Sequence, residues 1–250
     1  MIQKSTNLNK NNMKKIKGLF VIALTTISFA AISQTVDEVV DKHLAAVGGK
    51  DKWKAINSVI MEGSMEVQGA SVNITSKILQ GKGSRQDINV MGMSGYTIIT
   101  PTAGWTYMPW AGQSNAEAMA DSLVKMAGDQ LDAQGSLVDY KTKGNQVELL
   151  GKEDVDGKPA FKLKVTRPTG KVETIFIDAN SYYNVKTVAK QNVNGQEVEG
   201  TVYYSDFQKQ GDGYVFPMKI NMPMGMGMNA DFVLSKVSVN QPVDESVFKP

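Results

Sequence analysis

Residues 56–240 alternate between apolar and polar side chains in short segments that are separated by turn-forming dipeptides. Alternation at every second position predicts β-strands with one buried face, because successive side chains of a strand point to opposite sides of a sheet. Gln68-Gly69, Asp156-Gly157 and Asn194-Gly195 predict tight turns between neighbouring strands. Most of the chain is therefore expected to form a continuous antiparallel meander of about ten or eleven strands.

Two segments have helical spacing instead. The first begins with a capping box, in which Thr35 caps the helix and Glu38 reaches back, and it ends at Gly48-Gly49. The second is "SNAEAMADSLVKMAGDQL", with Ser114 as the expected cap. Two helices cannot cover both faces of a large sheet. We therefore expect an α+β fold, mainly antiparallel β: an incomplete, half-open β-barrel with the helices on its concave side.

The N-terminal segment is typical of an export signal. Lysines in residues 14–17 precede an apolar run at 18–32, and Ala31-Ile32-Ser33 offers the small residues that a signal peptidase reads. The apolar run is shorter than the roughly 20 residues of a bilayer-spanning helix. A cleavable signal peptide is the favoured interpretation, and an uncleaved anchor helix is the alternative.

These features divide the chain into two parts. Residues 1–33 are expected to be an N-terminal extension and cleavable signal peptide, with translation starting at Met1 or Met13, and residues 34–250 to be one periplasmic domain. Residues 1–33 hold five of the 27 lysines and arginines and none of the 25 acids, so the remainder has a net charge of −3. That charge, spread without long basic runs, argues against a nucleic-acid partner.

The sequence offers few residues for catalysis. It has no cysteine, which excludes disulfides, thiolate catalysis, iron–sulfur clusters and a lipid-modified cysteine. Its one histidine, His43, lies beside the apolar stripe of the first helix, and a packed helix-edge ring is the simpler interpretation. The G-x-G-x-x-A match at 225–230 precedes a strand-like segment, where a dinucleotide site needs a helix. We predict a non-enzyme without cofactor or metal, although a hydrolase using two distant carboxylates stays open.

Methionine and aromatic residues gather in a few short segments. In "NMPMGMGMNADF" four methionines alternate, which places them on one face of a strand as a flexible apolar row about 20 Å long. Such a row fits ordinary core, a soft-metal site for Cu(I), or the wall of an apolar cavity. We predict a cavity whose ligand-binding residues are Met91, Met93, Trp105, Tyr107, Met108, Trp110, Met119, Met222, Met224, Met226 and Met228.

Several segments together resemble one known family. They are "AAVGGKDKWKAINSVIMEGSM", "GWTYMPW", "KLKVTRPTGKVETIFIDANSYYNVKTV", "EGTVYYSDFQKQGDGYVFPMKI" and "VSVNQPVDESVFKP". With the export signal, they resemble the exported relatives of the LolA/LolB lipoprotein-carrier superfamily, often labelled outer-membrane lipoprotein-sorting proteins. The resemblance implies an incomplete antiparallel barrel around a helical lid, with an apolar cavity for acyl chains between them.

The resemblance makes the functional expectation specific. We expect a monomeric periplasmic carrier that sequesters lipid or lipoprotein acyl chains, takes part in outer-membrane biogenesis and meets a partner in the envelope membrane. The helical segment at 114–130 would act as its lid. The absence of cysteine separates the chain from the anchored LolB branch. A methionine-rich Cu(I)-binding protein is the alternative, and a purely structural domain is a further one.

Overall fold

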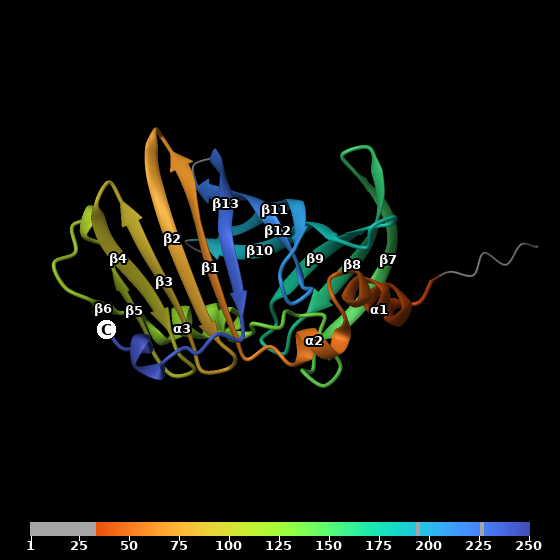
Figure 1. The fold of residues 1–250 in the computed structure, drawn as a ribbon, viewed down its shortest axis with the longest axis horizontal. Helices are drawn as coiled ribbons and strands as arrows, with labels where there is room; N and C mark the ends of the chain where they lie inside the picture. Colours follow the sequence, from red (N-terminus) through yellow and green to blue (C-terminus); the bar gives the residue numbers. More distant parts are fainter. Residues whose placement is uncertain (1–33, 194–195, 226–227) are drawn as a thin grey trace, which may run out of the picture. The chain divides into compact units, whose positions relative to one another are not determined.

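The computed structural model describes residues 34–193, 196–225 and 228–250. Thirteen strands of this part of the chain form one antiparallel sheet (Figure 1). The strands are β1 (Ser58–Val67), β2 (Ala70–Leu79), β3 (Gly83–Val90), β4 (Met93–Ile99), β5 (Gly104–Tyr107), β6 (Glu117–Ala118), β7 (Gln146–Val155), β8 (Lys158–Thr166), β9 (Val172–Asp178), β10 (Asn184–Val193), β11 (Gln196–Lys209), β12 (Val215–Gly225) and β13 (Met228–Val239).

The strand order explains how one chain builds this sheet. β1 pairs with β13 at the centre, so the first and last strands of the meander are neighbours. β2 to β6 follow outward on one side, and β12 back to β7 follow on the other. The sheet is open, with β6 and β7 at its edges, and the chain between these strands runs from one edge to the other. The predicted half-open barrel is confirmed, with more strands than the ten or eleven expected.

Tight turns set the register of the hairpins. The two-residue turns Gln68-Gly69, Met91-Gly92 and Asp156-Gly157 all have positive φ at both positions. Such turns match the right-handed twist of the flanking strands, which is why they are favoured in two-residue hairpins. The predicted turns at residues 68–69 and 156–157 are confirmed, and that at 194–195 lies outside the described residues.

Helix α1 (Val36–Ala46) packs on the β7–β9 part of the sheet. The predicted capping box is present: Glu38 N–H donates to Thr35 Oγ1 over 3.2 Å, and Thr35 N–H donates to the Glu38 carboxylate over 2.9 Å. One face of the helix is buried against strand side chains and against the chain that follows α3 (Asp121–Ala127). This core contains Val39, Val40, Leu44, Leu137, Val138, Phe161, Leu163, Val165, Ile175 and Ile177.

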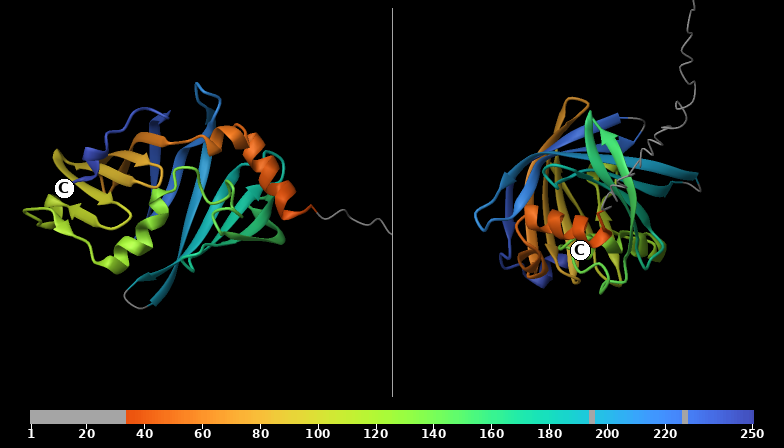
Figure 2. Two further views of the ribbon diagram at one scale, coloured as in Figure 1. Left: turned by 90° about the horizontal axis from the view of Figure 1, so that it is seen from below. Right: turned by 90° about the vertical axis from the view of Figure 1, so that its right-hand side faces the viewer.

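A second core lies under β1, β12 and β13. Its buried residues are Ile56, Val59, Met65, Tyr214, Phe216, Met218, Ala230, Phe232, Leu234, Val237 and Val239. Trp53 of the short helix α2 (Lys50–Lys54) packs against both cores. Seen from below, in the left panel of Figure 2, α1 and α3 lie in front of the strands, and the right panel shows the curvature of the sheet.

The predicted helix at 114–131 is wrong over its first half. Glu117 and Ala118 form β6, which pairs with Thr106 and Trp105 of β5. The helix α3 starts only at Asp121, with no side-chain cap, and the 3-10 helix η2 (Gly128–Leu131) follows. Pairing with a neighbouring strand therefore overrides the local helix preference of these residues. Two more 3-10 helices are η1 (Pro109–Ala111) and η3 (Glu245–Phe248).

No helix in the described part of the chain is both long enough and apolar enough to span a bilayer. The expected signal peptide at residues 1–33 lies outside the described residues.

Candidate ligand-binding cavity

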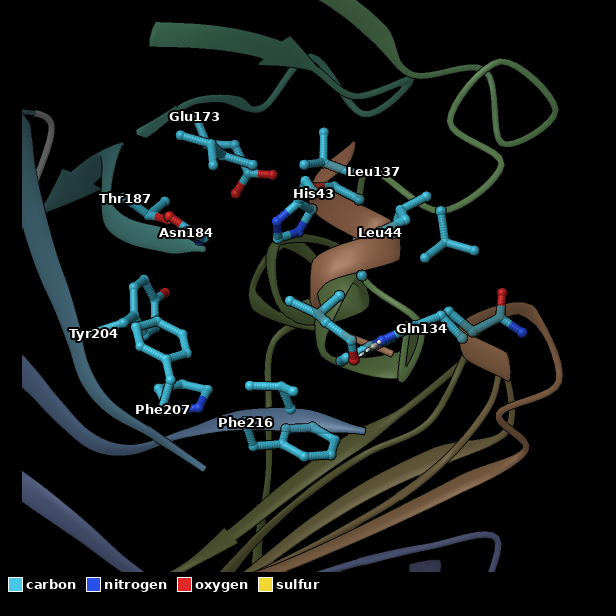
Figure 3. A pocket seen from close by; sticks show the side chains of 18 of the residues that line it. His43, Leu44, Gln134, Leu137, Glu173, Asn184, Thr187, Tyr204, Phe207 and Phe216 are labelled. Atoms are coloured by element: carbon cyan, nitrogen blue, oxygen red, sulfur yellow. Dashed lines mark hydrogen bonds between the residues drawn. The ribbon is translucent and has the colours of Figure 1, made fainter. Parts of the chain in front are cut away.

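A cavity of about 310 Å³ lies between α1, a loop at residues 134–138 and strands β9 to β12 (Figure 3). We call residues 134–138 the cavity loop. Most of the wall is apolar, formed by Leu44, Val47, Trp53, Leu137, Val138, Ile175, Phe207, Val215, Phe216 and Pro217. The polar side chains of the wall are His43, Gln134, Ser136, Arg167, Glu173, Asn184, Thr187 and Tyr204.

Aromatic rings form one end of the apolar wall. Trp53 lies 5.3 Å from Phe216, centroid to centroid, and its indole N–H donates to the Val47 carbonyl over 2.9 Å. Phe207 stacks on Tyr183 with centroids 4.5 Å apart. Because the indole N–H is satisfied within the protein, this end of the cavity presents mainly apolar ring surface to a ligand.

His43 brings an uncharged ring to the α1 side of the cavity. Its Nδ1 atom lies 2.8 Å from the Tyr182 carbonyl oxygen, and a carbonyl only accepts, so Nδ1 carries the proton in this contact. Burial lowers the pKa of His43, and the hydrogen bond to Tyr182 opposes this effect only in part. The imidazole is therefore neutral near pH 7, and its Nε2 atom keeps a lone pair.

Asn184 and Thr187 of β10 and Tyr204 of β11 form a polar cluster across the cavity from His43 (Figure 3). Asn184 Nδ2 donates to Thr187 Oγ1 over 3.1 Å. Burial raises the pKa of Tyr204, an effect that the nearby Thr187 hydroxyl opposes only in part, so the phenol stays protonated. Asn184 Oδ1 is shielded from solvent and accepts no hydrogen bond from the described residues.

Four charged residues lie beside this cluster and neutralise one another. Arg167 Nη2 lies 3.1 Å from the Glu173 carboxylate, and Asp129 Oδ2 lies 3.3 Å from Arg167 Nε and 3.1 Å from Lys171 Nζ. The Arg167 Nε–Asp129 contact lacks hydrogen-bond geometry and is an ion pair only. The side chains of Arg167, Glu173 and Asp129 are only 13%, 12% and 17% exposed. Asp129 belongs to η2, so these ion pairs fix the end of the α3 segment to the sheet.

Side-chain hydrogen bonds to backbone groups hold the cavity loop. Gln134 Nε2 donates to the carbonyls of Lys54 and Ile56 over 2.8 and 3.2 Å. Asn145 Nδ2 donates to the Ser136 carbonyl over 2.8 Å. These bonds satisfy backbone groups that lie outside the sheet ladder, so the loop can form a defined wall of the cavity.

Comparisons with known proteins identify the fold. No protein-family model matches the sequence, and no curated protein sequence matches it. Three solved structures share the fold. A LolA superfamily protein from Nitrosomonas europaea has a TM-score of 0.56 and 14% identity, and the match covers 87% of this chain and 99% of that one. A domain from Vibrio parahaemolyticus named for outer membrane lipoprotein sorting has a TM-score of 0.54 and 15% identity, with coverages of 84% and 94%, and a DUF1329 family protein from Desulfovibrio piger has a TM-score of 0.55 and 14% identity, with coverages of 87% and 98%.

The chain has a LolA-like fold. This confirms the family resemblance at the level of the fold, and identities of 14–15% carry the comparison no further. In this LolA-like fold the residues predicted to bind ligand are dispersed. Of the ten that lie in the described part of the chain, none lines the cavity between α1 and β9–β12.

The predicted methionine row occupies the outer end of the β12–β13 hairpin. Met222 is partly buried against the core under β1, β12 and β13, whereas Met224 and Met228 are each 39% exposed. A bulge between Pro223 and Gly225 interrupts the strand pairing at Met224. Met226 lies outside the described residues. The role of these side chains in ligand binding stays a prediction.

The other predicted residues surround β4 and β5. Met91 is 77% exposed and Met93 43% exposed, at the β3–β4 turn. Trp105, Met108 and Trp110 are partly buried. The ring of Tyr107 lies 5.7 Å from the ring of Tyr96, centroid to centroid. Met119 lines a second hollow, of about 960 Å³, beside α3.

The sequence analysis missed the polar residues of the cavity. Asn184, Thr187 and Tyr204 stand on strands with polar residues on both faces, so no pattern marks them as buried. The sequence did hold one signal of a buried polar residue. Glu173 lies two and four positions before the buried Ile175 and Ile177, so all three side chains point to the same face of the strand. A carboxylate on the apolar face of a strand indicates an ion pair or a binding site.

Residues 34–193, 196–225 and 228–250 contain no group of three or more histidine, aspartate or glutamate side chains placed to hold a metal ion. The three solved structures compared above are named for lipoprotein sorting or by family, and none of the three is named as an enzyme.

Proposed function

We propose that this protein is an exported carrier that holds an acyl chain of a lipid or lipoprotein in the cavity between α1, the cavity loop and β9–β12. The observation that carries the proposal is an apolar cavity of about 310 Å³ with a confined polar end. Ligand pockets commonly measure about 300–1,000 Å³, so this cavity suits one chain or part of one. The Vibrio relative's name, which refers to lipoprotein sorting, is consistent with this role.

Burial of methylene groups would drive binding. Each methylene removed from water contributes about 0.8 kcal/mol, so about ten of them would contribute about 8 kcal/mol. Association itself costs an estimated 4–15 kcal/mol, roughly the same amount. Apolar burial alone would therefore give weak and reversible binding, as a carrier needs, and polar contacts would decide which ligand is kept.

Loading and release require a moving wall. The chain between β6 and β7 includes α3, η2 and the cavity loop, and it is the segment we propose as the lid. Its contacts with the sheet include the ion pairs of Asp129 with Arg167 and Lys171. Ion pairs of this kind can separate and reform without refolding of the sheet, so they suit a lid that opens.

A binding experiment with the neutral fluorophore N-phenyl-1-naphthylamine tests the proposed function. We expect the protein to bind the probe and long-chain amphiphiles to displace it. Phe207→Asp, which places a charge in the apolar wall, should weaken binding at least tenfold, whereas Phe207→Leu should keep it near the wild-type level. Val233→Asp, at an exposed position of β13, is the control for charge alone.

The absence of displaceable probe binding by the folded protein would contradict the carrier function. Equal affinities of Phe207→Asp and Phe207→Leu would place the ligand elsewhere. Urea unfolding of each variant shows whether a loss of binding comes from a loss of folding.

The methionine hairpin supports a second candidate. Met224 and Met228 are both exposed at one end of the β12–β13 hairpin, and thioethers are soft ligands that suit Cu(I). Replacing the four methionines from Met222 to Met228 with leucine should abolish Cu(I) binding and leave probe binding intact. An unchanged Cu(I) affinity of this variant would exclude the methionine site.

A further inference from the structure

Arg167, the cation in the wall at the polar end of the cavity, already has carboxylate partners. Arg167 faces both Glu173 and Asp129, and Lys171 shares Asp129. The four side chains carry two positive and two negative charges, so the group is neutral. A carboxylate or phosphate on a ligand would enter a poorly hydrated end without an unpaired cation to meet it, which is unfavourable.

The polar atoms that remain are mostly hydrogen-bond acceptors. Asn184 directs its amide N–H to Thr187 Oγ1, which leaves Oδ1 shielded and without a donor among the described residues. His43 has its proton on Nδ1, toward Tyr182, and leaves the lone pair of Nε2 on the ring edge that faces the cavity (Figure 3). A buried acceptor without a donor is unfavourable, so a ligand that donates to Asn184 Oδ1 would remove this penalty.

Hydroxyl hydrogens are also available. Thr187 and Tyr204 each carry one, and both residues line the cavity. Thr187 Oγ1 already accepts from Asn184, so a hydroxyl hydrogen of Thr187 or Tyr204 can be given to a carbonyl oxygen of the ligand. The cluster therefore offers an acceptor and a donor side by side.

We propose that the polar end of this cavity selects an uncharged ligand head that carries a hydrogen-bond donor, an amide or a hydroxyl, and rejects carboxylate and phosphate heads. The inference rests on the proposed carrier function and adds the class of ligand to it. An amide fits best, because its N–H meets Asn184 Oδ1 while its carbonyl accepts from the Thr187–Tyr204 pair.

A ligand series with one chain length tests the selection. Decanamide, methyl decanoate and decanoate share their chain and differ in the head. The amide head is neutral and both donates and accepts hydrogen bonds, the ester head only accepts, and the carboxylate head is an anion. Competition against N-phenyl-1-naphthylamine at pH 8 gives the three affinities. We expect decanamide to bind at least tenfold more tightly than decanoate, with methyl decanoate between them.

Variants of Asn184 show whether this residue makes the selection. Asn184→Leu should lower the affinity for decanamide about tenfold and leave the affinity for methyl decanoate unchanged. The unchanged affinity for the ester would also show that the cavity of the variant is intact. Asn184→Asp should shift the preference toward decylamine, a cationic donor. Asn89→Leu is the matched control, since Asn89 also donates from its side chain to a hydroxyl, that of Ser94, over 3.1 Å, in a different part of the sheet.

The outcomes separate this inference from the carrier function. If all three ligands bind with similar affinity, or decanoate binds most tightly, the selection is wrong and the carrier function stands. If Asn184→Leu weakens the ester as much as the amide, the assignment to Asn184 is wrong. If none of the three displaces the probe, the carrier function itself fails.

Discussion

His43 shows how one residue serves packing and the cavity at once. Its ring fills space between α1 and the Tyr182 segment, and its Nδ1 proton goes to the Tyr182 carbonyl. The sequence analysis predicted a packed helix-edge ring, and the structure agrees. It could not predict that the other ring edge lines a cavity, because that depends on strand residues that lie 130 or more positions away in the chain.

Burial of His43 predicts that stability depends on pH. Burial lowers its pKa below the ordinary value of 6.5, so the unfolded chain takes up the proton more readily than the folded protein. This contribution to stability is full above pH 6.5 and is lost as the pH falls through the lower pKa of the folded state. The melting temperature should therefore fall more between pH 7.5 and 5 in the wild type than in His43→Gln. Parallel curves for the two proteins would contradict this.

Gly95 predicts a packing effect at the β4–β5 hairpin. A Cβ at this position would overlap the Tyr107 carbonyl oxygen and lie 2.8 Å from the ring of Trp110. Gly95→Ala should reduce the free energy of unfolding by about 1–3 kcal/mol, as overpacking does, measured by urea denaturation. Gly211→Ala has no atom of another residue within 4 Å of the new Cβ, apart from its chain neighbours, and should change stability by less than about 0.5 kcal/mol.

Elements were predicted most reliably where a local pattern decides them. The capping box at Thr35 and the turns at residues 68–69 and 156–157 depend on a few adjacent residues, and all are present. The helix predicted from Ser114 failed, because Glu117 and Ala118 pair with a strand that local propensity does not reveal. The helix of the proposed lid was therefore predicted in the right region, but its predicted start at Ser114 is wrong, since α3 begins at Asp121.

The lid makes a prediction at the level of this element. Asp129→Asn removes the charge that pairs with Arg167 and Lys171, so the lid should open more often and probe exchange should become about tenfold faster, a change of about 1.4 kcal/mol. Stopped-flow dissociation of N-phenyl-1-naphthylamine measures the rate. Asp121→Asn, in α3, is the control, because Asp121 has no ion pair within the described residues. Equal rates for both variants would exclude the Asp129 contacts as the latch.

At the scale of the whole molecule, the sheet order explains where a cavity can form. Because β1 pairs with β13, the two edges β6 and β7 are joined by the chain that includes α3, η2 and the cavity loop. This connection closes a space against strands that are distant in sequence. Alternation along one strand predicts which side chains share a face, but not whether that face meets core, cavity or solvent.

The methionine row illustrates this limit. Its period of two correctly indicates a strand, yet Met222 packs against a core while Met224 and Met228 are exposed at the hairpin end. The alternation therefore predicts the strand but not which of its side chains are buried. The cavity lies where residues of α1, α2, the cavity loop and four strands come together.

Tryptophan fluorescence tests the location of the ligand most directly, because the chain has three tryptophans and only Trp53 lines the cavity. The double variant Trp105→Phe/Trp110→Phe leaves Trp53 as the single reporter, and Trp53→Phe leaves Trp105 and Trp110, which the sequence analysis predicts as ligand-binding residues. A bromine near the chain end of decanamide quenches an indole that it contacts. We expect brominated decanamide, and not decanamide, to quench Trp53 at saturation and to leave Trp105 and Trp110 unquenched. Quenching of Trp105 and Trp110 with Trp53 unaffected would contradict this location and place the ligand beside β5 and η1 instead.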